Sequence, residues 1–446
     1  MKNYVCFCFI LMFFFAACDE SLTTDEGDQT NDVENPIVDA KEPISEMPYS
    51  QIPNKEYTID LAHWDIPNNS TNPEKTTDNL QAAIDWAVGE GYGKIRLPAG
   101  HYLIGKERTW QYQVGLDLRS NMALLLDKDA VIEMAPNDKG NQAAILVWKS
   151  VNVLISGGTI LGDRYQHTYS GGTSHNEGHL IEIKSENVTV ENVALGRAAG
   201  DAILMVGEPK NIDIRGNNIF DNRRQGVSVA GGENVVIENN EIHHTKGTNP
   251  QFGIDIESGT YSQNDIKIRN NHFHHNHGGD ICNRHGRNVL IENNIMEQGE
   301  GSEYRDGPIV YWNNADLTIR NNEITMLTRS LNGWIGIIMY SKGDPKTNPA
   351  TTHIYENTVT GCGFYMYKGA DLNIHDNKII EGFMCFKEMS NLTLNDNDVI
   401  YNSSAGRDKA YSFFQVTGSA SGNTYKGEPI DFPLSSEPWD GGIVMI

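Results

Sequence analysis

The sequence contains few cysteines, and no two of them have the spacing of a metal site. Only six of its 446 residues are Cys. Three lie within the first 18 residues, and the other three are widely separated: Cys282, Cys362 and Cys385. A disulfide framework needs an even set of cysteines, and a zinc ribbon needs Cys-x-x-Cys pairs. We therefore exclude both a disulfide-stapled fold and a cysteine metal site.

The sequence also lacks an excess of positive charge, and it lacks long apolar runs beyond its N-terminus. Lys and Arg number 35 against 59 Asp and Glu, a net charge of −24. Counterion release would oppose binding of such a chain to DNA or RNA, so nucleic acids are excluded as partners. The single long apolar run precedes residue 18, which excludes a protein with many membrane spans. With 39% hydrophobic residues, the remainder can bury a sizeable core.

The N-terminus has the features of an export signal. Met1-Lys2 is followed by a short apolar stretch and then by Ala16-Ala17-Cys18. Residues 1–17 resemble a bacterial lipoprotein signal peptide, which implies that Cys18 carries the lipid. Asp19-Glu20 resembles the surface-export signal of Bacteroidetes lipoproteins. The resemblance implies a protein of the outer membrane or cell surface, anchored in the membrane only through lipid at Cys18. The alternative is a cleaved signal and a soluble secreted protein.

The segment after Cys18 is acidic and polar. Residues 19–55 hold ten carboxylates against Lys41 and Lys55. Such a stretch cannot bury enough apolar surface to become ordered. We expect residues 18–55 to form a disordered tether that leads to a single folded domain over residues 56–446.

A short strand pattern recurs from residue 152 onward. Each copy begins with Asn or Asp and continues with alternating aliphatic residues, as in Asn152-Val-Leu-Ile. Most copies are 20–31 residues apart, and they begin at Asn152, Asn187, Asn211, Asn234, Asp265, Asn288, Asp316, Asp371 and Asn391. Repeats of this length with alternating strands are typical of solenoids rather than sandwiches. We predict an all-β fold, a right-handed parallel β-helix.

Paired asparagines close several of the repeats, at residues 217–218, 239–240, 270–271, 293–294 and 321–322. Asn tolerates the left-handed conformation of sharp turns, and its side-chain amide can bond to the next coil. We therefore expect asparagine side chains to be hydrogen-bonded from coil to coil along the turns.

A helix and a strand precede the first repeat. Over Thr76–Val88 the apolar residues Leu80, Ile84 and Ala87 fall on one helical face, with Thr or Asp as start signal and Gly89 as stop. A solenoid must cover its first coil, and this helix with the following strand would do so. The "LQAAID…LPAGHYLI" pattern and the repeats resemble the pectate-lyase superfamily of secreted β-helix proteins over about residues 56–430. That superfamily contains lyases, hydrolases, epimerases and phage adhesins, so the resemblance implies the fold more than an activity.

A second set of strands, usually beginning after Gly, allows outward-facing side chains to be predicted. If Val227, Ile254 and Ile281 point inward, their neighbours form columns on the outer surface. One column contains Ser228, Asp255, Cys282, Val310, Ile338 and Tyr365. The next contains Ala230, Glu257, Arg284, Trp312, Tyr340, Tyr367 and Lys387. Lys184 lies earlier on the same face, and the flanking turns hold Arg224, Gln225, Asp280 and His285.

The charged residues of these columns are candidates for a catalytic centre. Asp255 and Glu257 should stand about 7 Å apart on one strand, with Asp280 about 5 Å away on the next coil. Clustered carboxylates raise the pKa of one of their number, so that one can act as acid and another as base. Arg224 and Arg284 could hold a uronate or sulfate by paired hydrogen bonds. The alternative is a solvated ladder of charges on an exposed sheet.

Aromatic residues continue the second column. Trp312, Tyr340 and Tyr367 fall on consecutive coils, where a row of exposed rings offers platforms for sugar rings. The alternative is that the rings stack on one another for stability alone. The expected substrate-binding residues are Lys184, Gln225, His285, Trp312, Tyr340, Tyr365 and Tyr367.

Histidines occupy matching turn positions, at residues 243–244 and 274–275. They could bind a metal ion. Stacking of equivalent turn residues is the favoured interpretation, and no metal site is predicted.

The motif Gly253-Ile-Asp-Ile-Glu-Ser, with Gly279-Asp280 one coil later, resembles part of the polygalacturonase signature. That family has an Asn-Thr-Asp where this chain has Pro250-Gln-Phe, and a pair of aspartates of which only Asp280 is present here. Its Gly-His-Gly and Arg-Ile-Lys motifs are missing. The resemblance implies a distant glycosidase on the same face, and it argues against polygalacturonase activity itself.

Three functions remain open. A glycoside hydrolase would use Asp255 and Glu257, tuned by Asp280. A polysaccharide lyase would remove a proton next to a uronic carboxylate with a tyrosine or a basic residue of this face (Arg224, Arg284 or Lys184), and Ca²⁺ is then a possible cofactor. A non-catalytic glycan-binding protein would use only the aromatic column. We favour hydrolysis of an anionic polysaccharide by a monomer that requires no cofactor.

Overall fold

The computed structural model describes residues 49–109, 112–169, 178–299, 304–312, 316–327, 335–340, 351–401 and 409–444. The expected signal peptide, Cys18 and most of the expected tether lie outside the described residues. Contacts divide the chain after Pro43, and all of the described fold belongs to the second unit, Ile44–Ile446. None of the helices among the described residues has the length and apolar character needed to cross a membrane.

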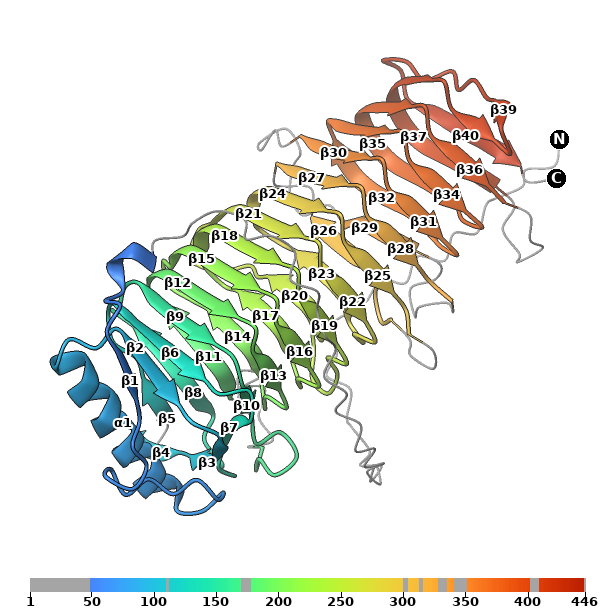
Figure 1. Ribbon diagram of the computed structural model, residues 1–446. Helices are drawn as coiled ribbons and strands as arrows, with labels where there is room; N and C mark the ends of the chain where they lie inside the picture. The colour runs from blue at the N-terminus through green and yellow to red at the C-terminus, as the bar shows by residue number, and fades with distance from the viewer. Residues whose placement is uncertain are drawn as a thin grey trace. The chain divides into compact units, whose positions relative to one another are not determined.

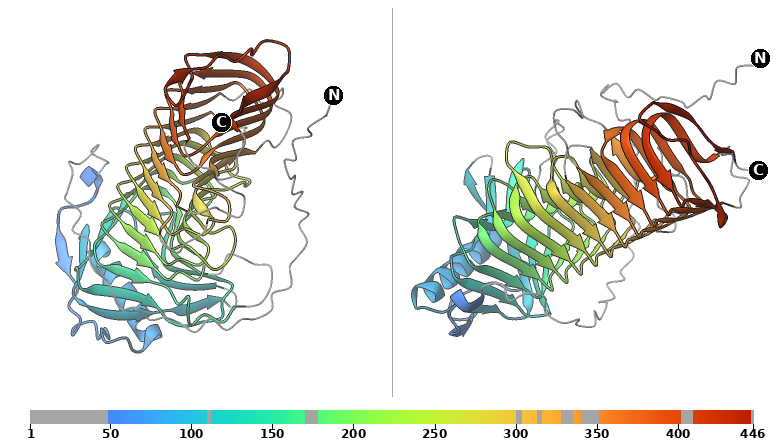
Figure 2. Two further views of the ribbon diagram at one scale, coloured as in Figure 1. Left: turned by 90° about the vertical axis from the view of Figure 1, so that its right-hand side faces the viewer. Right: turned by 90° about the horizontal axis from the view of Figure 1, so that it is seen from above.

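The described residues form the predicted parallel β-helix, in which a coil contributes three strands (Figure 1). Strands of successive coils lie side by side, and they form one sheet of 26 strands and another of 14. The larger sheet comprises two faces of the coil, which are joined through the long strands β35 (Met384–Asn395) and β37 (Lys409–Ser421). Figure 2 shows the same stacking of coils from two further directions.

The three faces of the coil are made of different strands. The first face contains β2 (Lys94–Leu97), β6 (Met122–Leu126), β9 (Val153–Ser156), β12 (Glu186–Glu191), β15 (Lys210–Arg215), β18 (Gly232–Glu238), β21 (Gln263–Arg269), β24 (Arg287–Glu292), β27 (Leu317–Arg320), β30 (Thr352–Tyr355) and β33 (Leu372–His375). The short-strand face contains β3 (Gly100–Ile104), β7 (Ala130–Met134), β10 (Thr159–Leu161), β13 (Ala194–Gly196), β16 (Asn218–Phe220), β19 (Glu241–His243), β22 (His272–His274), β25 (Ile295–Glu297), β28 (Glu323–Thr325), β31 (Thr358–Thr360), β34 (Lys378–Ile380), β36 (Asp398–Ile400), β38 (Thr424–Tyr425) and β39 (Glu428–Pro429). The third, which we call the site face, contains β5 (Tyr112–Asp117), β8 (Asn141–Trp148), β11 (His179–Lys184), β14 (Asp201–Met205), β17 (Gln225–Val229), β20 (Phe252–Ile256), β23 (Gly279–Asn283), β26 (Ile309–Trp312), β29 (Ile335–Tyr340) and β32 (Gly363–Ala370).

The core is the inside of the coil, filled by alternate residues of all three faces. Val227, Ile254 and Ile281 of the site face are fully buried in the same apolar cluster as inward residues of the other faces. The predicted inward placement of this column is therefore confirmed, and the residues between them point outward because side chains alternate along a strand.

Asparagine side chains are hydrogen-bonded from coil to coil along the turns, as predicted, but the two residues of a pair have different roles. At residues 217–218, Gly216 takes the left-handed conformation and Asn217 itself points inward. In the other four pairs the first residue adopts a left-handed conformation, as at Asn293 (φ 55°). The second points inward: Asn294 Nδ2 donates to Ile268 O and to Asn322 Oδ1, both at 3.0 Å. The buried ladder runs through Asn217, Asn240, Asn271, Asn294, Asn322, Asn357, Asn377, Asn397 and Asn423.

One coil escaped the repeat pattern. The long interval between the copies at Asp316 and Asp371 contains β30, which pairs in parallel with β27 on one side and β33 on the other. Its strand begins after Thr351 rather than after Asn or Asp, so the lead residue that marks most other coils is missing.

Both ends of the described solenoid are covered. Helix α1 (Pro73–Gly89) buries Leu80, Ile84 and Ala87 in the core and ends at the predicted glycine. It begins three residues before the predicted start, because Pro73 fits the first turn. Asn72 occupies the N-cap position without a side-chain capping hydrogen bond. Beside it β1 (Glu56–Thr58) pairs with β2, and η1 (Tyr49–Gln51) and the hairpin strand β4 (Lys106–Thr109) also belong to this end. At the other end β40 (Trp439–Val444) pairs antiparallel with β37.

Candidate active site

The register of the site face confirms the two predicted columns. Ser228 pairs with Asp255, and Asp255 with Cys282. In the second column Trp312 pairs with Tyr340, and Tyr340 with Tyr367. Parallel register therefore gathers side chains that are far apart in the sequence onto one stretch of the site face.

Asp255 lies at the centre of the charged part of this face and is almost completely buried, with 2% of its surface exposed. Gln225 Nε2 donates to its Oδ2 at 2.7 Å, whereas Oδ1 is buried without a hydrogen-bond partner among the described residues. Burial and the neighbouring Glu257 raise the pKa of Asp255 to about 6, with Arg284 opposing the shift. Asp255 is therefore a carboxyl group that can hold a proton near neutral pH.

Glu257, two residues later, has a different environment. Its Oε1 accepts hydrogen bonds from Arg224 Nη2 at 2.6 Å and from Ser228 Oγ at 2.7 Å. Its side chain is 23% exposed, so it is the carboxylate of the pair that solvent or a ligand can reach. Arg224 therefore makes a charge-assisted hydrogen bond to Glu257 and holds its carboxylate in place.

The site contains a third carboxylate, which was not predicted from the sequence. Asp201, on β14, is fully buried, and its Oδ2 lies 2.7 Å from Arg224 Nη1. Arg224 thus bridges Asp201 and Glu257. Burial, opposed in part by Arg224, raises the pKa of Asp201 to about 7. The Gly200-Asp201 pair resembles Gly279-Asp280 in sequence, but the register places Asp201 beside Gln225, in the row of Gly279 and not of Asp280.

Arg284 connects the charged centre to the aromatic column. Although burial opposes it, Cys282, Asp255 and Glu257 raise the pKa of Arg284, so this guanidinium stays charged. It lies 5.1 Å from the centroid of the Trp312 ring. A buried Nε of Arg284 has no hydrogen-bond partner among the described residues.

The aromatic column is less exposed than the sequence analysis expected. Trp312, Tyr340, Tyr365 and Tyr367 are all half-buried. The Trp312 and Tyr340 ring centroids are 5.6 Å apart, and both rings pack against an outer apolar cluster that includes Val310 and Ile338. The column is therefore both a stack of rings and a partly accessible surface.

Asp280 does not belong to the charged cluster, and its predicted role there is wrong. It is fully buried and is held by Tyr304 Oη at 2.6 Å and Asn276 Nδ2 at 3.0 Å. A Cβ on Gly253, the residue beside Asp280 on the preceding coil, would meet Phe273 and Asn276, so this position faces the interior. Burial raises the pKa of Asp280 to about 7, opposed in part by the hydrogen bonds from Tyr304 and Asn276. Asp280 is an interior hydrogen-bonding residue.

The other expected binding residues are dispersed. Gln225 is fully buried and holds Asp255, so it positions that carboxyl group rather than offering a contact to solvent. Lys184 lies three coils before Glu257 and forms an ion pair with Glu182 at 2.6 Å. His285 is exposed on the turn after Arg284.

The arrangement suits proton transfer between carboxyl groups. Glycoside hydrolysis uses two carboxyl groups that flank the scissile bond, one as acid and the other as base or nucleophile. Buried polar atoms without partners gather at Asp201, Arg224, Asp255 and Arg284. Such atoms are costly unless a ligand or water completes their hydrogen bonds.

Side-chain groups that could hold a metal ion lie elsewhere among the described residues. They gather at the short-strand face around His274, in the turns that the sequence analysis assigned to stacking. Whether Ca²⁺ binds at the carboxylates stays a prediction.

Comparisons with known proteins support the β-helix fold. The family described as "Right handed beta helix region" matches residues 111–248 and again 201–427. Among relatives, the SPbeta prophage-derived uncharacterized protein YorA of Bacillus subtilis is 29% identical over 300 residues, 60% of this chain and 49% of YorA. The uncharacterized protein YclG of the same organism is 26% identical over 383 residues, 73% of this chain and 63% of YclG. The chain thus spans about half to under two thirds of the length of these relatives.

Solved structures share the architecture at low identity. The hyperthermoactive exopolygalacturonase of Thermotoga maritima aligns over 89% of this chain and 96% of its own, with a TM-score of 0.53 and 13% identity. The A-module of the Azotobacter vinelandii mannuronan C-5 epimerase AlgE6 aligns over 85% and 97%, with a TM-score of 0.50 and 18% identity. A tailspike double mutant of Escherichia coli bacteriophage HK620, in complex with a pentasaccharide, covers 80% of this chain and 68% of its own, with a TM-score of 0.51 and 15% identity.

Proposed function

The chain belongs to the right-handed beta-helix family, and we propose that it acts on a polysaccharide by hydrolysing glycosidic bonds. The named neighbours include an exopolygalacturonase, a mannuronan epimerase and a tailspike bound to a pentasaccharide. At 13–18% identity these neighbours support the shared fold. The choice of reaction is supported by the carboxyl groups of the site face.

The observation that carries the proposal is the contrast between Asp255 and Glu257. Asp255 is buried, with a pKa raised to about 6, so it can donate a proton to the leaving oxygen. Glu257 is partly exposed and held by Arg224 and Ser228, so it can activate water or attack the sugar. Two carboxyl groups in unlike environments are the arrangement that separates acid from base.

Lyase chemistry is less well supported by the same residues. A lyase base must be able to lose its proton, but neighbouring carboxylates raise the pKa of both Arg224 and Arg284 even though burial opposes the shift. Burial and Asp306 raise the pKa of Tyr340 to about 12. These groups therefore suit binding of an anion better than removal of a proton.

An anionic substrate is favoured by Arg284. Its guanidinium is half-buried, lies beside the Trp312 ring and has a buried Nε without a partner among the described residues. A uronic carboxylate could accept a hydrogen bond from this guanidinium while its sugar ring packs against the indole of Trp312.

The test is the activity of Asp255→Asn on a panel of uronic-acid-containing polysaccharides. We expect at least about a 100-fold loss of new reducing ends, because the proton donor is removed and general acid catalysis contributes about 10²–10⁴-fold. Asp213→Asn is the matched control. Asp213 is also buried with a pKa raised to about 6, but it lies on β15 of the first face and bonds Arg215. Equal activity in the two variants would remove the carboxylate mechanism.

We further propose that the protein is anchored to the outer membrane or cell surface by lipid at Cys18. The lipoprotein-like signal of residues 1–17 supports this location. Cys18→Ala should abolish incorporation of labelled fatty acid and release the protein from the membrane fraction. Labelling that persists in the variant would contradict the anchor.

A further inference from the structure

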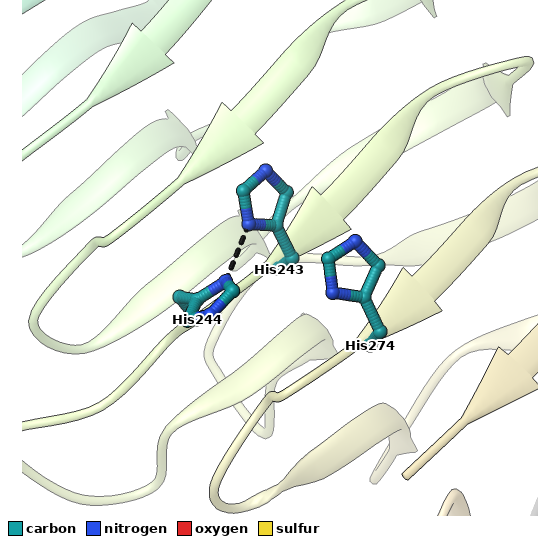
Figure 3. A group of neighbouring side chains, drawn as sticks. All are labelled: His243, His244 and His274. Carbon is teal, nitrogen blue, oxygen red and sulfur yellow. Dashed lines mark hydrogen bonds between the residues drawn. The ribbon is translucent and has the colours of Figure 1, made fainter. Parts of the chain in front are cut away.

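The histidine turns of the short-strand face bring imidazoles of two coils together. Strand β19 pairs with β22, so that His243 lies beside His274. The next residues, His244 and His275, both have left-handed backbones, with φ of 57° and 56°. The turns therefore present their side chains alike, and the ring centroids are 4.6 Å apart in the first pair and 4.4 Å in the second. Figure 3 shows His243, His244 and His274 gathered at the turn.

Hydrogen bonds at the far edge of two rings determine which nitrogen carries a proton. His274 Nε2 lies 3.1 Å from Glu241 Oε1, and His243 Nε2 lies 2.9 Å from Asn218 Oδ1. Both oxygens are acceptors, so each Nε2 is the donor and each neutral ring has its lone pair on Nδ1. Metal-binding histidines are held in this way by a carboxylate or carbonyl at the other nitrogen.

The two lone pairs face other imidazole nitrogens. His243 Nδ1 is 2.6 Å from His244 Nδ1, and His274 Nδ1 is 2.8 Å from His275 Nδ1. One ligand nitrogen from each of His243, His244 and His274 lies within 4.8 Å of the other two. By the same argument, His244 donates its Nδ1 proton to His243 and His275 donates to His274. Binding of a metal ion in their place requires the His244 proton to move to its Nε2 and the His274–His275 contact to open.

We propose that His243, His244 and His274 bind one divalent transition-metal ion of the Zn²⁺ class. Three imidazoles with one open position for water are a common coordination set for Zn²⁺. Zn²⁺–N distances of about 2.0–2.1 Å require the nitrogens to lie roughly 3.3–3.4 Å apart in a tetrahedral site. His244 is exposed on its turn, so it is the ligand that can shift to this spacing.

The bound ion would link successive coils. His243 and His244 belong to one coil and His274 to the next, so the metal adds a cross-link outside the asparagine ladder. Because it binds the folded arrangement only, it should raise the unfolding temperature. The site lies on a different face from Asp255 and is independent of the proposed hydrolysis.

A competing site shares one ligand. Glu241, His272 and His274 also bring ligand atoms within 4.8 Å of one another. That set would use the other edge of His274, where Nε2 already bonds Glu241, while His272 Nε2 contacts Glu297 at 3.1 Å. A variant of His272 therefore separates the two arrangements.

The experiment is titration of untagged, chelator-treated full chain with Zn²⁺ by calorimetry, with Ca²⁺ as a second titrant. We expect one Zn²⁺ per chain, a raised unfolding temperature and no comparable binding of Ca²⁺, which prefers oxygen ligands. His244→Gln should weaken Zn²⁺ binding by about 10–100-fold or more, since even outer partners of a ligand have effects of that size. His272→Gln is the matched control and should bind like the parent.

Each outcome decides the proposal. His244 is exposed, so its variant should keep the fold, which circular dichroism of the metal-free protein checks. Tetrahedral absorption bands with Co²⁺, lost in His244→Gln, would support the three-histidine site. Absence of Zn²⁺ binding by the parent, or binding that is lost in His272→Gln and kept in His244→Gln, would overturn it.

Discussion

Asp255 in β20 and Glu257 just after it are two positions apart, and they have different chemistry because their surroundings differ. Asp255 is buried and accepts a hydrogen bond from Gln225, whereas Glu257 lies beyond the end of the strand and accepts one from Arg224. Alternation of side chains predicted that both carboxylates face outward. It could not predict their difference in burial, because that difference depends on Asp201 and Arg224 from earlier coils.

A second prediction at the residue scale concerns Asp280 and pH. Its pKa is about 7 in the fold against an ordinary value of 3.8. Because the folded pKa is raised, its contribution is fully present below the unfolded pKa and is lost as pH rises through about 7. We expect the stability of the protein to fall between pH 5 and pH 8, with at least about 1 kcal/mol of that fall coming from this group.

Asp280→Asn should reduce that pH dependence, because the amide does not ionise. The measurement is denaturant unfolding at pH 5 and pH 8, with exposed Asp376→Asn as the matched control. Buried Asp201, Asp213 and Asp255 retain part of the slope. An unchanged difference between the two pH values in Asp280→Asn would contradict the interior role.

At the scale of elements, the recurring strand pattern predicted nearly all coils from residue 152 onward, whereas the Asn-Asn pairs predicted only part of the buried asparagine ladder. Asn-Asn pairs mark five of its members, but Asn357, Asn377, Asn397 and Asn423 follow Glu, Asp or Gly. The turn needs only a left-handed backbone at the first position, and Glu356 and Gly422 also adopt it. The Thr351 coil was missed because it lacks the polar lead residue. A pattern tied to one residue type therefore undercounts elements whose requirement is conformational.

Removal of one rung tests the ladder. Asn294→Ala should lower the free energy of unfolding by at least about 2 kcal/mol, because it removes the buried hydrogen bonds that Asn294 makes to Ile268 O and Asn271 N–H. Chemical denaturation measures the change. The comparison variant is Asn234→Gly at an exposed position of β18, which keeps the left-handed backbone. It loses only the exposed hydrogen bond to Asn211 and should cost less than about 1 kcal/mol. Equal losses in both variants would argue against a special role for the buried ladder.

At the scale of the whole solenoid, stacking converts sequence repeats into a surface that crosses several coils. Arg284, Trp312, Tyr340 and Tyr367 follow one another on consecutive coils. Register of this kind is predictable from spacing, since one strand follows another at a regular interval. The inward turn of Asp280 is not, because it depends on Asn276 and Tyr304 at the corner of the coil.

A glycan that follows this surface should bind through Trp312. Trp312→Ala should weaken binding of long oligosaccharides by about tenfold, which corresponds to about 1.4 kcal/mol for a lost aromatic contact. Calorimetry with oligosaccharides of increasing length is the measurement. Tyr261→Ala is the comparison variant, because Tyr261 is an exposed aromatic residue (44%) outside the column. Equal affinity of the Trp312 variant and the parent would restrict the column to a stabilising role.

The most direct test of the proposed hydrolysis is simultaneous measurement of reducing ends and ultraviolet absorbance during digestion of uronic-acid-containing polysaccharides. Hydrolysis at Asp255 and Glu257 predicts new reducing ends with no rise in absorbance. Elimination would instead create an unsaturated sugar, and absorbance that rises in step with the reducing ends would contradict the account.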